Sequence, residues 1–334
     1  MKKYTLDLVG CDHAKEYFIS ALNGGYLSHA YIIEGASGSG RHTLIKELLK
    51  AMACESDNAP CGECGCCVRL EAGVCVDVHV IKAAEGKTEL TVDLIRGIYD
   101  SVGLMPADIP FKAYIIEDGD KMNRSAQNAF LKLFEEPPEN VYFFIITTDA
   151  QALLPTIRSR ALIIRTERLD REQMKVVLDK KGIPDNKKRE DAITLSNGCA
   201  GEAMRIYEDG ADAVKLRDAA DKLIKALLSP GSDKLSFINV HQKNIKKTDE
   251  LCRVYALLQT ALRDVIAVKI GATEQTVYFT NYEDAEEYSL HISDRAVIKT
   301  NDVISELLSI SDVPLNPALA ITEFASRVWD AHLV

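Results

Sequence analysis

The sequence predicts an α/β domain built on a five-stranded parallel sheet, followed by two smaller all-helical domains. Three observations predict this class. The first half carries short apolar runs of strand length, segments with helical periodicity lie between these runs, and the pattern becomes helical throughout after Arg165. The length of 334 residues fits two or three domains at roughly 150 residues each.

The predicted strands are Ala30–Glu34, Val78–Lys82, Ala113–Glu117, Val141–Thr147 and Ala161–Arg165. Each is almost continuously apolar and rich in β-branched and aromatic residues, which is typical of strands buried on both faces. Helical periodicity separates them at His42–Met52, Val92–Val102 and Ser125–Phe134. This alternation predicts βαβ units and a doubly wound sheet over residues 1–165.

The helical remainder divides into two parts. Residues 166–210 are expected to form a small helical domain, beginning with an amphipathic helix at Thr166–Gly182. Residues 211–334 carry a strong apolar helical face at Leu251–Val268 and a last helix at Ala318–Ala331. These patterns predict a separate C-terminal helical domain.

The charge balance limits the classes of partner. Forty Lys and Arg residues against fifty Asp and Glu give a net charge of −10, which excludes a wholly basic nucleic-acid binder. No apolar run approaches the roughly 18–20 residues of a membrane span, and the N-terminal segment lacks the apolar core of a signal peptide. We therefore expect a cytoplasmic protein with no membrane partner.

A glycine-rich loop follows the first predicted strand. The segment Gly35–Thr43 reads Gly-Ala-Ser-Gly-Ser-Gly-Arg-His-Thr, and it has glycines at both motif positions of a Walker A loop, Gly35 and Gly40, with Gly38 between them. Such glycines let backbone N–H groups and a helix N-terminus surround a phosphate. The loop is therefore a candidate phosphate site.

The side chains of this loop depart from the motif. Arg41 stands where a lysine reaches the β- and γ-phosphates, and its planar fork is bulkier than an ammonium. His42 replaces the hydroxyl that binds Mg²⁺, and Thr43 is rotated by about 100° along the helix and cannot take its place. We expect weak nucleotide binding or none, and no ATP turnover; a glycine-rich turn without a ligand is the simpler alternative.

An acidic pair ends the third predicted strand. A Walker B site places Asp-Glu there, with the Asp helping to hold Mg²⁺ and the Glu polarising the attacking water. Here the order is reversed, as Glu117-Asp118. Because each side chain then differs by one methylene from the required length, this pair looks like a degenerate catalytic site; a merely solvated strand end is the alternative.

Six of the nine cysteines lie between residues 54 and 75. Cys54, Cys61, Cys64 and Cys67 offer four thiolates with two C-x₂-C spacings, which suits a tetrahedral Zn²⁺. Because the chain is expected in a reducing compartment, metal is favoured over disulfides. The spacing predicts a structural zinc module at about residues 54–67, with Cys66 as an alternative fourth ligand.

A short Ser-Arg element, Ser159-Arg160, precedes the fifth predicted strand. An arginine at such an edge can reach the γ-phosphate of a neighbouring subunit, which raises the rate by about 10³–10⁵. A surface ion pair worth at most about 1 kcal/mol is the ordinary alternative, and spacing alone favours it.

Several of these motifs together resemble bacterial clamp-loader subunits of DNA polymerase III. The matching segments are Ser28–Tyr31, the four-cysteine module, Asn128–Pro138, Thr147-Thr148 and Ser159-Arg160, with a thinner match at Asn316-Pro317. The stretch Asn128–Pro138 is the most specific. The resemblance is dense over about residues 5–165 and mainly architectural beyond them.

The resemblance implies an AAA+ domain (1–165), a small helical lid domain (166–210) and a helical collar (211–334). It also implies a hetero-pentameric ring with gamma/tau and delta that loads a sliding clamp onto primer-template DNA during replication. Arg41, His42 and the reversed acidic pair resemble the delta-prime type, whose ATP chemistry has decayed, rather than the ATPase type, gamma/tau.

On this resemblance Arg160 is the arginine finger that acts in trans beside Ser159, and Arg158 is the fallback. Ala161 replaces the cysteine that usually follows this Ser-Arg pair. The chain would then be a non-hydrolysing stator within the DNA polymerase III holoenzyme.

Two other functions stay open. One is a catalytically active gamma/tau-like AAA+ ATPase in which Arg41 does the work of the lysine. The other is a zinc-dependent nucleic-acid module that acts alone, against which the acidic charge balance weighs.

Overall fold

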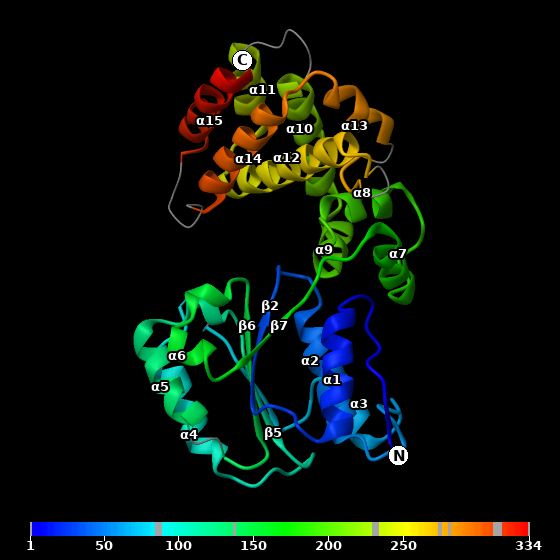
Figure 1. Ribbon diagram of the computed structural model, residues 1–334, viewed down its shortest axis with the longest axis vertical. Helices are drawn as coiled ribbons and strands as arrows, with labels where there is room; N and C mark the ends of the chain where they lie inside the picture. Colours follow the sequence, from blue (N-terminus) through cyan, green and yellow to red (C-terminus); the bar gives the residue numbers. More distant parts are fainter. Residues whose placement is uncertain are drawn as a thin grey trace. The chain divides into compact units, whose positions relative to one another are not determined.

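The continuous apolar runs form one parallel sheet, as predicted (Figure 1). Its strands are β2 (Ala30–Glu34), β4 (Val78–Ile81), β5 (Lys112–Ile116), β6 (Val141–Thr147) and β7 (Leu162–Arg165). They lie in the order β4-β5-β6-β2-β7, and every neighbouring pair is parallel. All five predicted strands are thus confirmed, with bounds that differ by at most one residue.

This computed structural model describes residues 2–83, 89–135, 138–228, 234–272, 276–279, 282–309 and 316–332. Glu136 and Pro137 of the Asn128–Pro138 stretch lie outside the described residues. The chain divides into two units, Met1–Leu169 and Asp170–Val334.

Helices cover both faces of the sheet, which explains why its strands are apolar throughout (Figure 1). Helices α1 (Asp12–Gly24) and α2 (Arg41–Ala53) pack on one face, and α4 (Val92–Val102) and α5 (Arg124–Glu135) pack on the other. Successive residues of a strand point to opposite faces. In β2, Tyr31 accordingly packs with the first pair of helices and Ile32 with the second.

A small insertion follows α2 and carries the clustered cysteines. It contains β3 (Asn58–Ala59) and α3 (Gly65–Ala72). Strand β1 (Lys3–Tyr4) pairs with β3 in parallel, so the start of the chain is held against this insertion. The Lys2 ammonium also donates to the Cys54 carbonyl.

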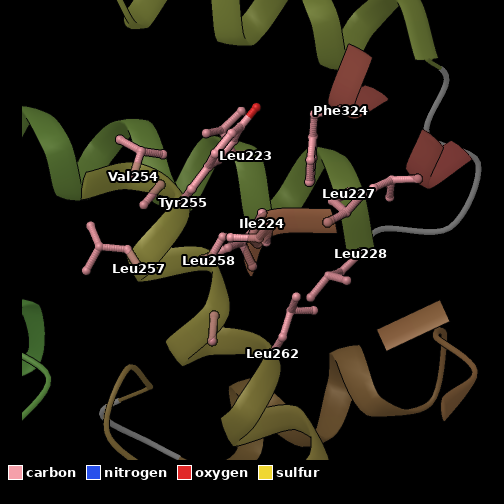
Figure 2. Packing of buried hydrophobic residues seen from close by; sticks show 14 of the residues in the cluster. Leu223, Ile224, Leu227, Leu228, Val254, Tyr255, Leu257, Leu258, Leu262 and Phe324 are labelled. Atoms are coloured by element: carbon pink, nitrogen blue, oxygen red, sulfur yellow. The ribbon is translucent and has the colours of Figure 1, made fainter. Parts of the chain in front are cut away.

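The described part of the second unit consists of helices and their connections. They are α7 (Arg171–Lys180), α8 (Lys187–Leu195), α9 (Ala200–Asp209), α10 (Ala211–Leu228), α11 (Lys234–Asn244), α12 (Thr248–Lys269), α13 (Tyr282–Ser289), α14 (Asp294–Ser309) and α15 (Pro317–His332). Side chains of α10 to α15 form its core, in which Leu223, Leu258 and Phe324 are buried together (Figure 2). Among the described helices, none is both long and apolar enough to cross a membrane.

The first helix of this unit begins later than its sequence pattern suggests. Asp170 accepts a hydrogen bond from the N–H of Gln173, whose side chain bonds back to Asp170, so a capping box sets the start at Arg171. Thr166 instead continues the extended chain after β7, and its N–H donates to the Glu34 carbonyl (2.8 Å). The domain boundary near residue 210 stays a prediction.

A buried histidine links the stability of the second unit to pH. His241 is fully buried between Phe237, Tyr255 and Phe324. Burial lowers the pKa of His241 to about 3, because an apolar surrounding disfavours the imidazolium. The unfolded chain therefore binds the proton more readily between pH 6.5 and 3.

We predict that the free energy of unfolding falls as the pH drops below about 6.5, with about 3 kcal/mol lost through His241 by pH 4.5. A His241→Leu variant should lose less stability over this range, since leucine cannot be protonated. Urea unfolding at pH 7.0 and 4.5 measures the difference, with exposed His13→Leu as the control. Parallel losses in wild type and His241→Leu would contradict the assignment.

Candidate functional site

The sheet brings the loops that carry the candidate residues to one edge. The strands are parallel, so the segments after β2, β5, β6 and β7 all leave from their carboxyl ends. In open α/β sheets ligands bind outside these ends. The glycine-rich loop follows β2, and the acidic pair follows β5.

The glycine-rich loop adopts backbone conformations that need glycine. Gly38 has φ of 77° and Gly40 of 89°, in the left-handed region. A Cβ on Gly35 would lie 2.0 Å from Oγ1 of Thr166. The loop therefore packs directly against the chain that leaves β7, and α2 begins immediately after Gly40.

The three residues that follow the last glycine differ in exposure. Arg41 is buried, with 6% of its surface exposed, and it makes interactions within the protein. His42 and Thr43 are exposed at the start of α2. Arg41 therefore lies within the protein at the start of α2 and does not extend toward solvent.

His42 and Glu117 contact each other. The Nε2 atom of His42 lies 3.1 Å from Oε1 of Glu117, and both side chains are partly exposed. These are the residues that stand at the two Mg²⁺-holding positions of the loop and the acidic pair. The imidazole and the carboxylate thus contact each other at the positions where the motif needs two oxygen ligands for one cation.

Asp118 does not join this contact. It has a left-handed φ of 47°, and its carboxylate pairs with the Lys121 ammonium at 3.1 Å. The structure thus separates the two acidic side chains that the sequence singles out. Asp120 points back to the sheet instead, and its Oδ1 accepts a hydrogen bond from the Thr147 hydroxyl at 2.9 Å.

Three further contacts at this edge were not predicted. The Ser39 and Thr166 hydroxyls are 2.7 Å apart and join the loop to the segment after β7. The Glu34 carboxylate accepts hydrogen bonds from the Ala150 N–H (3.0 Å) and from Nε of Arg165 (2.7 Å). Burial alone would raise the pKa of Glu34, but these donors outweigh it and hold the pKa below its usual range. In the sequence, a carboxylate at the end of an otherwise apolar strand is the pattern that could have indicated a role for Glu34 at this edge.

The Ser-Arg element lies at the end of a short helix, α6 (Pro155–Arg158). Arg160 is partly exposed, and its Nη2 lies 3.2 Å from Oε1 of Glu135. The Ser159 hydroxyl donates to the Thr156 carbonyl at 3.1 Å. The guanidinium of Arg158 turns to the side chain of Gln151 at 2.5 Å. Arg160 is thus held by a neighbouring helix and still reaches solvent.

The insertion gathers four cysteine sulfurs. The Sγ atoms of Cys54, Cys61, Cys64 and Cys67 all lie within 4.8 Å of one another. A Zn–S bond of about 2.3 Å places sulfurs of a tetrahedral site about 3.8 Å apart, so the four residues fit a zinc ion. The cluster contains the end of α2, the start of α3 and the turn between them.

Backbone N–H groups donate to two of the four sulfurs, whereas burial raises the pKa of Cys67 to about 12. The Cys61 N–H donates to Sγ of Cys54 and the Cys64 N–H to Sγ of Cys61, both at 3.4 Å. Donors from Glu63 and Cys64 lower the pKa of Cys61 to about 6. Thiolates are the form that binds metal, so this turn is suited to a cation.

Cys66 faces away from the four sulfurs. Its Sγ lies 3.7 Å from the Asp108 carbonyl and 3.9 Å from Nη2 of Arg69. Because adjacent residues on a helix point in directions about 100° apart, Cys66 and Cys67 cannot both enter the cluster. The geometry favours Cys67 as the fourth ligand.

The comparisons with known proteins agree with this architecture. The family described as "DNA polymerase III, delta subunit" matches residues 10–170. DNA polymerase III subunit gamma of Buchnera aphidicola subsp. Acyrthosiphon pisum is 30% identical over 260 residues, which cover 74% of this chain and 70% of the relative. This chain belongs to the DNA polymerase III clamp-loader subunit family.

One further relative matches over a shorter stretch, and one solved structure aligns over most of the chain. DNA polymerase III subunit tau of Escherichia coli K12 is 39% identical over 175 residues, which cover 52% of this chain and 27% of tau. A gamma subunit-related protein of known structure from Thermotoga maritima aligns with a TM-score of 0.48 and 18% identity over 94% of this chain and 99% of that one. The chain thus spans most of one curated relative and about a quarter of the other.

We predict that the purified chain contains about one zinc ion. Cys64→Ser should lose the metal and lower the melting temperature, because bound zinc contributes about 10–16 kcal/mol of local folding free energy. Cys66→Ser is the matched control and should keep the metal. Elemental analysis and thermal melts measure both effects. Metal loss in Cys66→Ser alone would contradict the ligand set.

Proposed function

We propose that this chain is a delta-prime-like subunit of the DNA polymerase III clamp loader. It acts in the cytoplasm in a hetero-pentameric ring with gamma/tau and delta, and it supports loading of the sliding clamp onto primed DNA. In this role it does not hydrolyse ATP. It contributes Arg160 in trans to the ATP site of the adjacent motor subunit.

The contact between His42 and Glu117 carries the proposal. Mg²⁺ requires oxygen ligands in near-octahedral geometry, and imidazole is a poor ligand for this hard cation. A histidine at 3.1 Å from the carboxylate supports the loss of a Mg²⁺ site in this subunit. Without Mg²⁺ the charge that develops on a transferring phosphoryl group is not neutralised.

The neighbouring side chains also support the loss of ATP chemistry in this subunit. Asp118 stands where the motif has the glutamate that polarises the attacking water, and its carboxylate pairs with Lys121 instead. The hydroxyl pair of Ser39 and Thr166 closes the loop against the chain after β7. Ser39 and His42 thus contact residues that follow β7 and β5, which supports weak nucleotide binding or none.

The exposed guanidinium supports the contribution in trans. Arginine offers five N–H donors in a rigid fork that matches phosphate oxygens. Arg160 keeps this group at the surface, with 38% of its side chain exposed. Catalysis across a subunit interface needs a positively charged side chain that is both held in position and accessible. The Arg160 guanidinium has both properties.

The zinc module has a structural part in this proposal. Its four sulfurs join the end of α2 to the start of α3, beside the β1–β3 pair. A closed four-cysteine site leaves no open coordination position for chemistry. The metal would therefore stiffen this insertion and take no part in phosphoryl transfer.

A gamma/tau-like ATPase is the second candidate, since both curated relatives described above are gamma or tau subunits. Arg41 would then have to serve the β- and γ-phosphates. Its planar fork is bulkier than the ammonium that the motif uses, which weighs against this role.

We predict that the isolated chain shows no Mg²⁺-dependent ATP turnover above background, because His42 offers imidazole where the motif has a hydroxyl ligand for the cation. A phosphate-release assay at saturating ATP tests this. Turnover that Arg41→Ala abolishes would favour the ATPase instead.

We also predict that Arg160→Ala slows ATP hydrolysis by the reconstituted ring by about 10²-fold or more, since an arginine finger supplies about 10³–10⁵. Arg158→Ala is the matched control and should change the rate less than twofold. Steady-state hydrolysis with clamp and primed DNA measures both variants. An unchanged rate in Arg160→Ala would remove the role in trans.

A further inference from the structure

We propose that Glu135 is a positioning residue for Arg160. The inference rests on the proposed role of Arg160 in trans and names the side chain that holds the finger in place. Nη2 of Arg160 donates to Oε1 of Glu135 at 3.2 Å, across 25 residues of sequence. Glu135 is the last residue of α5, whereas Arg160 follows α6.

A second contact fixes the other end of the guanidinium. Nη1 of Arg160 donates to the Thr156 carbonyl at 3.1 Å and lies 3.5 Å from the Ser159 hydroxyl. The fork is therefore held on one side by its own turn and on the other by Glu135. Two anchors on different elements define the direction in which a planar group points.

These contacts leave donors for a ligand. A guanidinium has five N–H donors. The contacts with Glu135, Thr156 and Ser159 engage three of them at most. The remaining N–H groups suffice for one phosphate oxygen or two. Glu135 thus holds the group without consuming its capacity to bind phosphate.

Helix α5 is itself joined to the approach to α6. The Gln127 side chain is buried; its Nε2 donates to the Met122 carbonyl (3.0 Å), and its Oε1 accepts from the Leu154 N–H (2.7 Å). Ile157 of α6 is also fully buried in the core that contains α5. Gln127 and Ile157 therefore fix α6 against α5, which brings Glu135 within reach of Arg160.

The contact contributes little to stability. Glu135 and Arg160 have 52% and 38% of their side chains exposed, and exposed ion pairs contribute less than about 1 kcal/mol. A misplacement of about 1 Å in a catalytic group can nevertheless lower a rate by 10²-fold. Loss of Glu135 should therefore alter catalysis while leaving the fold intact.

The test is a double-mutant cycle in the reconstituted ring with gamma/tau, delta, the clamp and primed DNA. The variants are Glu135→Gln, Glu135→Ala, Arg160→Ala and the combination of Glu135→Gln with Arg160→Ala, with Glu139→Gln as the control because Glu139 lies exposed a few residues further on. Glutamine keeps the size of the side chain and removes its charge. Ring assembly by native mass measurement and the melting temperature of each chain accompany the kinetics.

We expect Glu135→Gln to lower kcat about tenfold with KM for ATP changed less than twofold, unchanged assembly and an unchanged melting temperature. In the Arg160→Ala background the same substitution should have no further effect, because Glu135 acts only through that guanidinium. Glu139→Gln should behave as wild type.

Three outcomes would overturn the inference. An unchanged kcat in both Glu135→Gln, whose amide oxygen can still accept from Arg160, and Glu135→Ala, which has no acceptor, would show that Glu135 does not position the finger. A faster rate would show that the carboxylate restrains Arg160 instead. An effect that persists beside Arg160→Ala would assign Glu135 to another contact. If Arg160→Ala itself leaves the rate unchanged, the proposed function fails first, so the two failures are distinguishable.

Discussion

The parallel pairing of β2 with both β6 and β7 is the constraint on which the candidate site depends. Backbone hydrogen bonds set the register of these strands, so their carboxyl ends lie side by side. The glycine-rich loop, Asp120 with Thr147, and Thr166 then meet at one edge although they are far apart in sequence. Helices on both faces bury the strands and keep this edge in place.

At this edge, two side chains of the chain contact each other at the positions where the family motif would bind a cation. The bond between His42 and Glu117 joins two strand–helix units directly. Such a contact is weak in solvent, but it uses the very side chains that a Mg²⁺ site would need. Around the candidate finger the opposite holds, because Glu135 and Thr156 orient the Arg160 guanidinium and leave it accessible. The chain thus combines a glycine-rich loop whose side chains contact neighbouring segments with a partly exposed guanidinium.

Much of this architecture can be predicted from local patterns. The five strands follow from short runs that are almost continuously apolar. The start of α7 shows the limit of such patterns, because the amphipathic periodicity extends back to Thr166 whereas the capped helix begins at Arg171. The four cysteines are close in sequence, so their spacing alone indicates a shared turn. The choice between Cys66 and Cys67 depends on which face of α3 meets the turn, which spacing leaves open.

The sequence by itself determined which segments form strands and helices along the chain, the glycine positions of the loop and the presence of a cysteine cluster, because each depends on residues a few positions apart. Tertiary structure alone decided that His42 meets Glu117, that Ser39 meets Thr166 and that Glu135 meets Arg160. These partners belong to different elements. Their contact depends on strand order and helix packing, which sum many weak interactions along the whole chain and leave no local pattern at the residues themselves.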